Sequence, residues 1–147
     1  DSIRKTAGAL EGVAAKKDIH FDLELSDTEP LWVSGDKDKI QQVLHNLMDN
    51  AVKFSHEGSS ILISTREKGN RVFVSVKDSG IGIPKDDLGK IFERFYKTDL
   101  SRGKDKLGTG LGLSICKEII TAHKQNLDVV STEGVGSEFV FTLTKET

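Results

Sequence analysis

The sequence is poor in the residue types that mark secreted and membrane-spanning proteins. It has one cysteine, Cys116, so no internal disulfide can form, which is typical of a reducing compartment. No apolar run approaches the roughly 18 residues of a membrane-spanning helix, and the first residues do not resemble a signal peptide. We therefore expect a chain on the cytoplasmic side, with no direct membrane contact of its own.

A strong charge of either sign is also missing. Although 30% of the residues are charged, the net charge is only −2, which gives neither the positive field of a nucleic-acid-binding protein nor an acidic tail. The 147 residues fit a single domain that buries well over half of its unfolded surface. Because internal repeats and low-complexity tracts are absent, we predict one domain over residues 1–147 and no nucleic-acid partner.

Hydrophobic periodicity predicts both helices and strands. Apolar residues at helical spacing indicate helices, and alternating or β-branched runs indicate strands. Cys116 falls in a helical apolar run, which favours a buried, inert thiol, since reactive cysteines need an accessible, electropositive setting. We expect helices over 1–16, 36–55, 86–96 and 109–123, strands over 19–25, 31–33, 60–66, 71–77, 127–131 and 137–143, and a loop over 97–107.

The second predicted helix has an apolar face and a compact polar face. Asn46, Asn50 and Lys53 fall within an arc of about 60°, roughly 130° from the centre of the apolar stripe. The Asn50 amide oxygen suits Mg²⁺, a hard cation that prefers oxygen ligands, and Lys53 could compensate phosphate charge. For the helix alone, an ordinary solvated face is the commoner interpretation. Phe54 projects between the two faces, where it could close the core or lie against a flat base.

Two glycine clusters follow this helix. In Asp78-Ser-Gly-Ile-Gly82 a carboxylate at a strand end can accept a hydrogen bond from an exocyclic amine, while the glycines let the backbone approach a ring. A turn capped by Asp78 is the alternative. Gly108-Thr-Gly-Leu-Gly112 precedes a helix, where consecutive N–H groups can bind an anion. Its spacing fits neither a P-loop nor a dinucleotide fingerprint.

Four motifs in this order resemble those of the sensor histidine kinases. Asn46-Leu-Met-Asp-Asn50-Ala-Val-Lys53-Phe54 is similar to their N box, and Asp78–Gly82 to their first glycine box. Phe92-Glu-Arg-Phe-Tyr96 is similar to the F box, and Gly108–Leu113 to the second glycine box. The resemblance runs essentially from end to end. Within the family, the chain is similar to cell-envelope sensor kinases of Gram-positive bacteria.

The resemblance implies a fold of the α+β class, the Bergerat-type ATP-binding fold shared with gyrase and Hsp90. This fold is a two-layer α/β sandwich, in which a mixed, mostly antiparallel sheet is covered on one face by helices. With ATP and Mg²⁺ bound, Asn50 would ligate the metal, Lys53 would contact phosphate and Asp78 would receive the adenine amine, under a lid formed by 97–107. The remaining implied nucleotide-binding residues are Phe54, Gly80, Gly82, Ile83, Arg94, Lys97, Gly108, Thr109, Gly110, Leu111, Gly112 and Leu113.

The position of Asn46 bears on the reaction. It stands four residues before Asn50, where ATPases of this superfamily usually carry a Glu that activates water. Asn cannot accept a proton, so efficient hydrolysis is disfavoured, whereas phosphoryl transfer depends on positioning and charge neutralisation. The resemblance thus implies the catalytic domain of a histidine kinase, with Asn46, Asn50 and Lys53 as catalytic residues. The alternatives are a GHKL-type ATP-hydrolysing module and a non-catalytic interaction module of the same fold.

A phosphate acceptor is missing from the sequence. None of His20, His45, His56 and His123 is followed by the acidic residue and Arg-Thr-Pro run of the family's H box, so we expect structural or solvated histidines. The resemblance then implies two partners outside the chain. One is a dimerisation domain that carries the acceptor histidine, expected before Asp1, and the other is a response regulator served through that domain. The full-length protein would be a membrane-anchored receptor.

Overall fold

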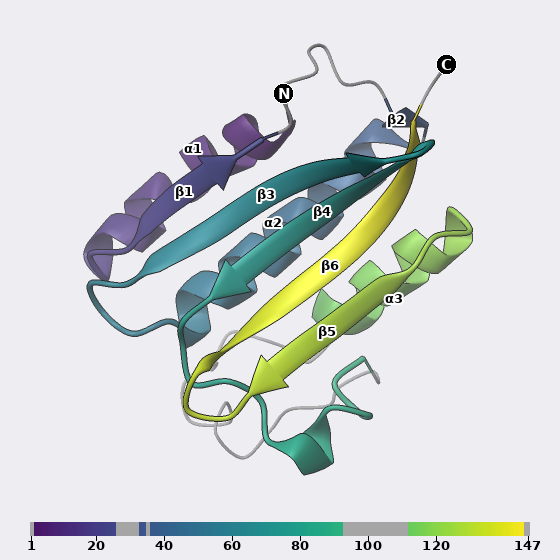
Figure 1. The fold of residues 1–147 in the computed structure, drawn as a ribbon. Helices are drawn as coiled ribbons and strands as arrows, with labels where there is room; N and C mark the ends of the chain where they lie inside the picture. The colour runs from purple at the N-terminus through teal and green to yellow at the C-terminus, as the bar shows by residue number, and fades with distance from the viewer. Residues whose placement is uncertain (1, 26–32, 35, 93–111, 146–147) are drawn as a thin grey trace.

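The computed structural model describes residues 2–25, 33–34, 36–92 and 112–145, and shows an α+β fold with a six-stranded mixed sheet. Helices cover one face of the sheet, so the predicted fold class is confirmed (Figure 1). The helices are α1 (Ser2–Lys16), α2 (Lys37–Phe54) and α3 (Gly112–Ala122), with a 3₁₀ turn at Lys85–Asp87. The strands are β1 (His20–Glu24), β2 (Val33–Ser34), β3 (Ser60–Lys68), β4 (Arg71–Asp78), β5 (Leu127–Thr132) and β6 (Gly136–Lys145).

The strand order is β1-β3-β4-β6, and both β5 and the short β2 pair with β6. Among the strands of the described residues, the β1–β3 pair is parallel and the other pairs are antiparallel. The register of β4 against β6 sets Asp78, the last residue of β4, opposite Ser137 near the start of β6. This pairing brings two chain segments together that lie far apart in the sequence.

The long helix α2 is fixed at both ends by side chains. The Asp36 carboxylate caps its start by accepting N–H bonds from Asp38 (3.0 Å) and Lys39 (3.2 Å). The Asp36 N–H donates to Nε2 of His123 (3.0 Å), while Nδ1 of His123 is bonded to the Ile119 carbonyl (2.8 Å). A neutral ring protonated at Nδ1 satisfies both contacts. His123 is thus a structural histidine that ties α3 to α2, as the sequence predicts.

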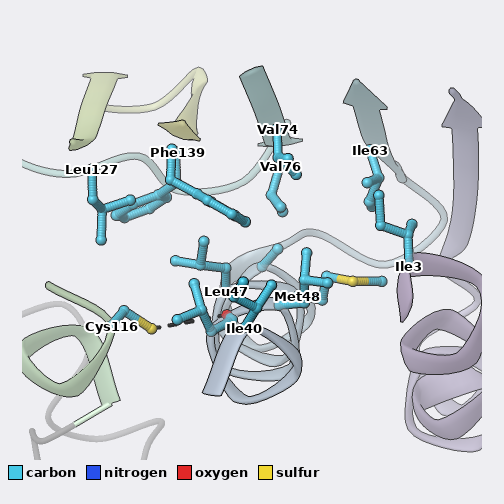
Figure 2. Packing of buried hydrophobic residues seen from close by; sticks show 14 of the residues in the cluster. Ile3, Ile40, Leu47, Met48, Ile63, Val74, Val76, Cys116, Leu127 and Phe139 are labelled. Atoms are coloured by element: carbon cyan, nitrogen blue, oxygen red, sulfur yellow. Dashed lines mark hydrogen bonds between the residues drawn. The ribbon is translucent and has the colours of Figure 1, made fainter. Parts of the chain in front are cut away.

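The core lies between the sheet and the helices (Figure 2). Leu47 and Met48 of α2 point toward Val76 of β4 and Ile63 of β3, and Ile3 of α1 closes one side. On the other side, Leu127 and Phe139 of β5 and β6 extend the same cluster toward α3. The apolar stripe of α2 is therefore buried where its periodicity predicts.

Of the strand predicted at 31–33, only Val33 is described, and it begins β2, in agreement with the prediction. Two other predictions need correction. The structure extends the β3–β4 pairing to Lys68 and Arg71, so the connecting turn is shorter than the predicted 67–70. In place of a helix over 86–96, the described part has only the 3₁₀ turn and irregular turns up to 92.

The described part of this segment, up to Phe92, has a weak local preference for a helix and makes tertiary contacts instead. Gly89 interrupts it, which weakens helix propensity. The Phe92 ring instead packs edge-on against Phe139, with ring centroids 6.3 Å apart. The Lys117 ammonium lies 5.3 Å from the centre of the Phe92 ring. These contacts hold the segment on the core without a helix.

Cys116 is buried in α3, and its sulfur lies 3.9 Å from the Val43 carbonyl oxygen (Figure 2). Burial raises the pKa of this thiol to about 12, and a hydrogen bond with the Asn46 side chain offsets only part of that rise. We expect iodoacetamide at pH 8 to alkylate the folded chain at least about 100-fold more slowly than the urea-unfolded chain, since the thiolate is the nucleophile. Mass spectrometry measures both rates. Equal rates would contradict the predicted inert thiol, and Cys116→Ser is the blank.

Candidate nucleotide-binding site

Four predicted site residues lie on the second half of α2. Asn46, Asn50, Lys53 and Phe54 are each half-buried, so this polar face is neither core nor fully solvated. The Asn46 side chain faces Cys116 of α3 and lowers the pKa of that thiol by less than burial raises it. The Lys53 ammonium lies 3.2 Å from the Asp49 carboxylate. Asn50 and Lys53 remain one helical turn apart, as the sequence predicts.

Asp78 opens the first glycine loop, which we define as residues 78–82. Its side chain is buried at 7% exposure. Its Oδ1 accepts the N–H of Gly80 (2.9 Å) and the N–H of Ser137 (3.3 Å). Because both of these bonds end on Oδ1, the other carboxylate oxygen can receive a donor from a ligand.

Burial is the largest influence on the Asp78 carboxyl. It raises the pKa above the usual value of 3.8, while the N–H bonds from Gly80 and Ser137 and the electrostatic influence of His56 lower it by less. The charged form is therefore incompletely compensated within the protein. A donor group on a ligand would supply part of the missing stabilisation, which is what recognition of an amine requires.

The first glycine loop lies against the end of α2. The Ile81 N–H donates to the Phe54 carbonyl oxygen (3.1 Å). A Cβ atom added to Gly80 would lie only 2.0 Å from the same oxygen, so no larger residue fits there. The structure thus joins the two predicted motifs that contain Phe54 and Gly80.

The opposite side of the loop contacts the β5–β6 turn, which we define as residues 132–136. Gly82 has φ +71°, and a Cβ there would lie 2.2 Å from the Thr132 carbonyl oxygen. The Gly134 N–H donates to the Ile81 carbonyl (2.7 Å). A Cβ on Gly136 would lie 2.2 Å from the Asp78 carbonyl oxygen. The first glycine loop is therefore held between α2 and this turn.

Ser131, on β5, links three segments around the loop. Its Oγ accepts the N–H of Ile83 (2.8 Å) and lies 3.0 Å from the Gly136 carbonyl and 2.8 Å from the Ser137 hydroxyl. Sequence reasoning misses Ser131, Ser137 and the glycines of this turn, because two predicted strands over 127–131 and 137–143 indicate only a hairpin connection between them. The two glycines of this turn are the sequence signal that could have indicated a close contact. One of them, Gly136, lies close to the Asp78 backbone.

The second glycine box is described only at its end. Gly112 is the first residue of α3, and Leu113 is half-buried. Helix α3 packs against α2 and β5. Arg94, Lys97, Gly108, Thr109, Gly110 and Leu111 lie outside the described residues, as do the predicted lid 97–107 and most of the F box.

This fold is that of a known class of ATPase domains. Residues 35–147 match the model "Histidine kinase-, DNA gyrase B-, and HSP90-like ATPase", and the chain belongs to this family. It is 45% identical over 127 residues to the sensor histidine kinase WalK of Bacillus subtilis (strain 168), covering 85% of this chain and 21% of WalK. The chain thus spans about a fifth of this curated relative.

Solved structures of histidine kinases share the fold. The catalytic domain of histidine kinase ThkA has a TM-score of 0.84 and 36% identity, covering 98% of this chain and 90% of that domain. Full-length ShkA in complex with AMPPNP has a TM-score of 0.85 and 30% identity, covering 99% of this chain and 30% of ShkA. ThkA is also known in complex with the response regulator protein TrrA. The fold is therefore that of a histidine kinase catalytic domain.

Proposed function

We propose that this chain binds Mg²⁺-ATP and transfers the γ-phosphate to a histidine of a separate dimerisation domain, from which a response regulator receives it. The observation that carries the proposal is the buried Asp78 carboxylate, whose Oδ1 is held by two backbone N–H groups in a loop packed between α2 and the β5–β6 turn. The similarity to WalK and to the ThkA catalytic domain supports a kinase rather than another family member.

The base would be recognised by the first glycine loop. Asp78 would accept the adenine amine, and the absence of side chains at Gly80 and Gly82 would let the backbone approach the ring. Phe54, whose carbonyl is bonded to Ile81, would lie beside the base. The AMPPNP complex of ShkA supports an adenine nucleotide as the ligand.

The phosphates would be held from α2. The Lys53 pair with Asp49 joins residues four apart on a partly exposed helix face, and such pairs contribute only about 0.3–0.5 kcal/mol. Phosphate oxygens could therefore compete with the Asp49 carboxylate for the Lys53 ammonium. The half-buried Asn50 offers an amide oxygen, which fits Mg²⁺ when the phosphates supply further ligands. When bound, Mg²⁺ would neutralise charge that develops on the phosphates.

Transfer is favoured over hydrolysis by the chemistry of Asn46, because an amide cannot take a proton from water. The acceptor would lie outside the chain, because His123 is occupied by structural contacts and the sequence has no H box. The complex of ThkA with TrrA supports a response regulator as the downstream partner. By analogy with sensor relatives, the whole protein would be a membrane-anchored receptor; within the described residues, no helix is long and apolar enough to cross a membrane.

The proposal is tested by mixing the chain with γ-labelled Mg²⁺-ATP and a separately produced acceptor-helix domain. We expect acid-labile label on the acceptor histidine, since phosphohistidine is hydrolysed in acid. Lys53→Met should reduce the labelling rate at least about 10-fold, a loss equivalent to about 1.4 kcal/mol of charge stabilisation. Lys39→Met, which removes an exposed lysine from the first turn of the same helix, should not change it.

Three other outcomes would contradict this function. Steady phosphate release without any acceptor would indicate a hydrolytic ATPase of the same fold. No heat of binding and no thermal shift with Mg²⁺-AMPPNP would indicate a non-catalytic interaction module. Label that survives on an acceptor whose histidine is replaced by Gln would rule out histidine as the target.

A further inference from the structure

Lys17 lies in the turn after α1 and reaches the far end of α2. Its Nζ donates to the carbonyl oxygens of Val52 (2.9 Å) and Lys53 (3.1 Å). Its own carbonyl accepts the Gly58 N–H (3.1 Å). Lys17 therefore holds the end of α2 and the chain that follows it through both side chain and backbone.

These contacts act on carbonyls at the end of the helix, where the Val52 carbonyl also accepts a long bond from the Ser55 N–H (3.4 Å). The last carbonyls of a helix have no N–H partner four residues later, and they carry the negative end of the helix dipole. An ammonium group that donates to two of them satisfies hydrogen bonds and compensates this charge. The stabilisation is local, because it concerns only the last turn of α2.

That last turn carries proposed ligand contacts on one side and the first glycine loop on the other. The carbonyls of Val52 and Lys53 are bonded to Lys17, and the next carbonyl, of Phe54, accepts the Ile81 N–H (3.1 Å). Three successive carbonyls thus connect the α1–β1 turn, α2 and the glycine loop. The Lys17 side chain thus reaches the backbone of Lys53, one of the proposed nucleotide contacts.

We propose that Lys17 is a positioning residue for nucleotide binding. By fixing the last turn of α2, it orients Lys53 toward the phosphates and keeps the Phe54 carbonyl against the glycine loop. The inference rests on the proposed nucleotide site. It concerns a residue outside the segment 35–147 that matches the family model, and outside all four sequence motifs.

The test uses three variants. Lys17→Met keeps much of the side-chain length but removes the positive charge and the N–H donors. Lys17→Arg keeps the charge and the donors. Lys16→Met is the matched control, because Lys16 is the neighbouring lysine, is exposed and ends α1. Calorimetry with Mg²⁺-AMPPNP, well below every melting temperature, should show affinity reduced roughly 5- to 20-fold in Lys17→Met. Lys17→Arg should recover most of the affinity, and Lys16→Met should equal the unmodified chain.

Amide hydrogen exchange without nucleotide separates positioning from general destabilisation. Lys17→Met should lower the protection of the Ile81 amide, which bonds Phe54, while the Phe141 amide in the central strand β6 keeps its protection. If Lys17→Met does not fold, Lys17→Gln replaces it in the test. This variant keeps a neutral donor, so we expect an intermediate loss of AMPPNP affinity.

Two results would overturn the inference: unchanged AMPPNP affinity and Ile81 protection in Lys17→Met, or an equal loss of protection at Ile81 and Phe141. Failure of the unmodified chain to bind AMPPNP would instead refute the proposed function. The Ile81 measurement would still report whether Lys17 positions the loop, so the two failures are distinguishable.

Discussion

Asp78→Asn is expected to remove most of the ATP affinity while the chain stays folded. Asn keeps the Oδ1 atom that accepts the N–H groups of Gly80 and Ser137. It also puts an NH₂ group where the second carboxylate oxygen stands, so that two donors would face each other when adenine binds. A hydrogen bond to a charged group contributes about 1.5–3 kcal/mol, which corresponds to a dissociation constant raised roughly 10- to 150-fold. Calorimetry with Mg²⁺-AMPPNP measures the change.

The pH dependence gives this prediction a second readout. Because burial raises the pKa of Asp78 above 3.8, protonation stabilises the folded state below the unfolded pKa, and this contribution is lost as the pH rises through the folded pKa. Asp78→Asn carries no charge. It should therefore melt at the same or a higher temperature than the unmodified chain at neutral pH, with the difference vanishing in acid.

Asp128→Asn serves as the control for both readouts. Asp128 is an exposed residue of β5, so its replacement should change neither affinity nor the pH profile. An unchanged dissociation constant in Asp78→Asn would remove the basis for adenine recognition at this loop. A large loss of stability in that variant would show instead that the charge, and not only the acceptor atom, holds the loop.

Gly82→Ala is expected to have the largest effect on stability. Its backbone has φ +71°, a conformation that disfavours any Cβ, and the added atom would lie 2.2 Å from the Thr132 carbonyl oxygen. That turn cannot easily withdraw, since the Gly134 N–H is bonded to the Ile81 carbonyl (2.7 Å). Backbone strain and overpacking each cost about 1–3 kcal/mol. We expect a melting temperature lower by about 5–15 °C, because each kcal/mol shifts it about 2–4 °C.

Gly89→Ala is the matched control for this substitution. Gly89 has open space around its added Cβ and no positive φ, so its replacement should stay within about 0.5 kcal/mol. Scanning calorimetry with and without AMPPNP compares the two variants. If Gly82→Ala and Gly89→Ala had the same melting temperature, the contact between the glycine loop and the β5–β6 turn would not constrain the fold.

The features of the fold that sequence predicts well are those with periodic signals. The apolar stripe of α2 is buried, as its periodicity indicates. The segment around Phe92 was predicted as a helix from the same kind of spacing. Its described part, up to Phe92, forms turns instead, and the Phe92 ring contacts Phe139, a residue of a distant strand that local spacing does not reveal.

The site was predicted only in part, for a physical reason. Asp78, Gly80 and Gly82 are recognisable because an acid followed by spaced glycines has a local chemical meaning. Ser131 and Lys17 have no such meaning until the fold brings a hydroxyl to Ile83 and an ammonium to the end of α2. The roles of Asn50, Lys53 and the glycines in binding nucleotide remain predictions for the experiments above.

The position of β6 in the sheet has a consequence for how the site is made. This strand follows β2, β4 and β5 in the sequence, yet it pairs with all three and supplies the Ser137 N–H to Asp78. While only the residues up to β5 have left the ribosome, the strand that completes the glycine loop is still missing. The ability to bind nucleotide should therefore appear only after β6 has emerged, in a single step with closure of the sheet.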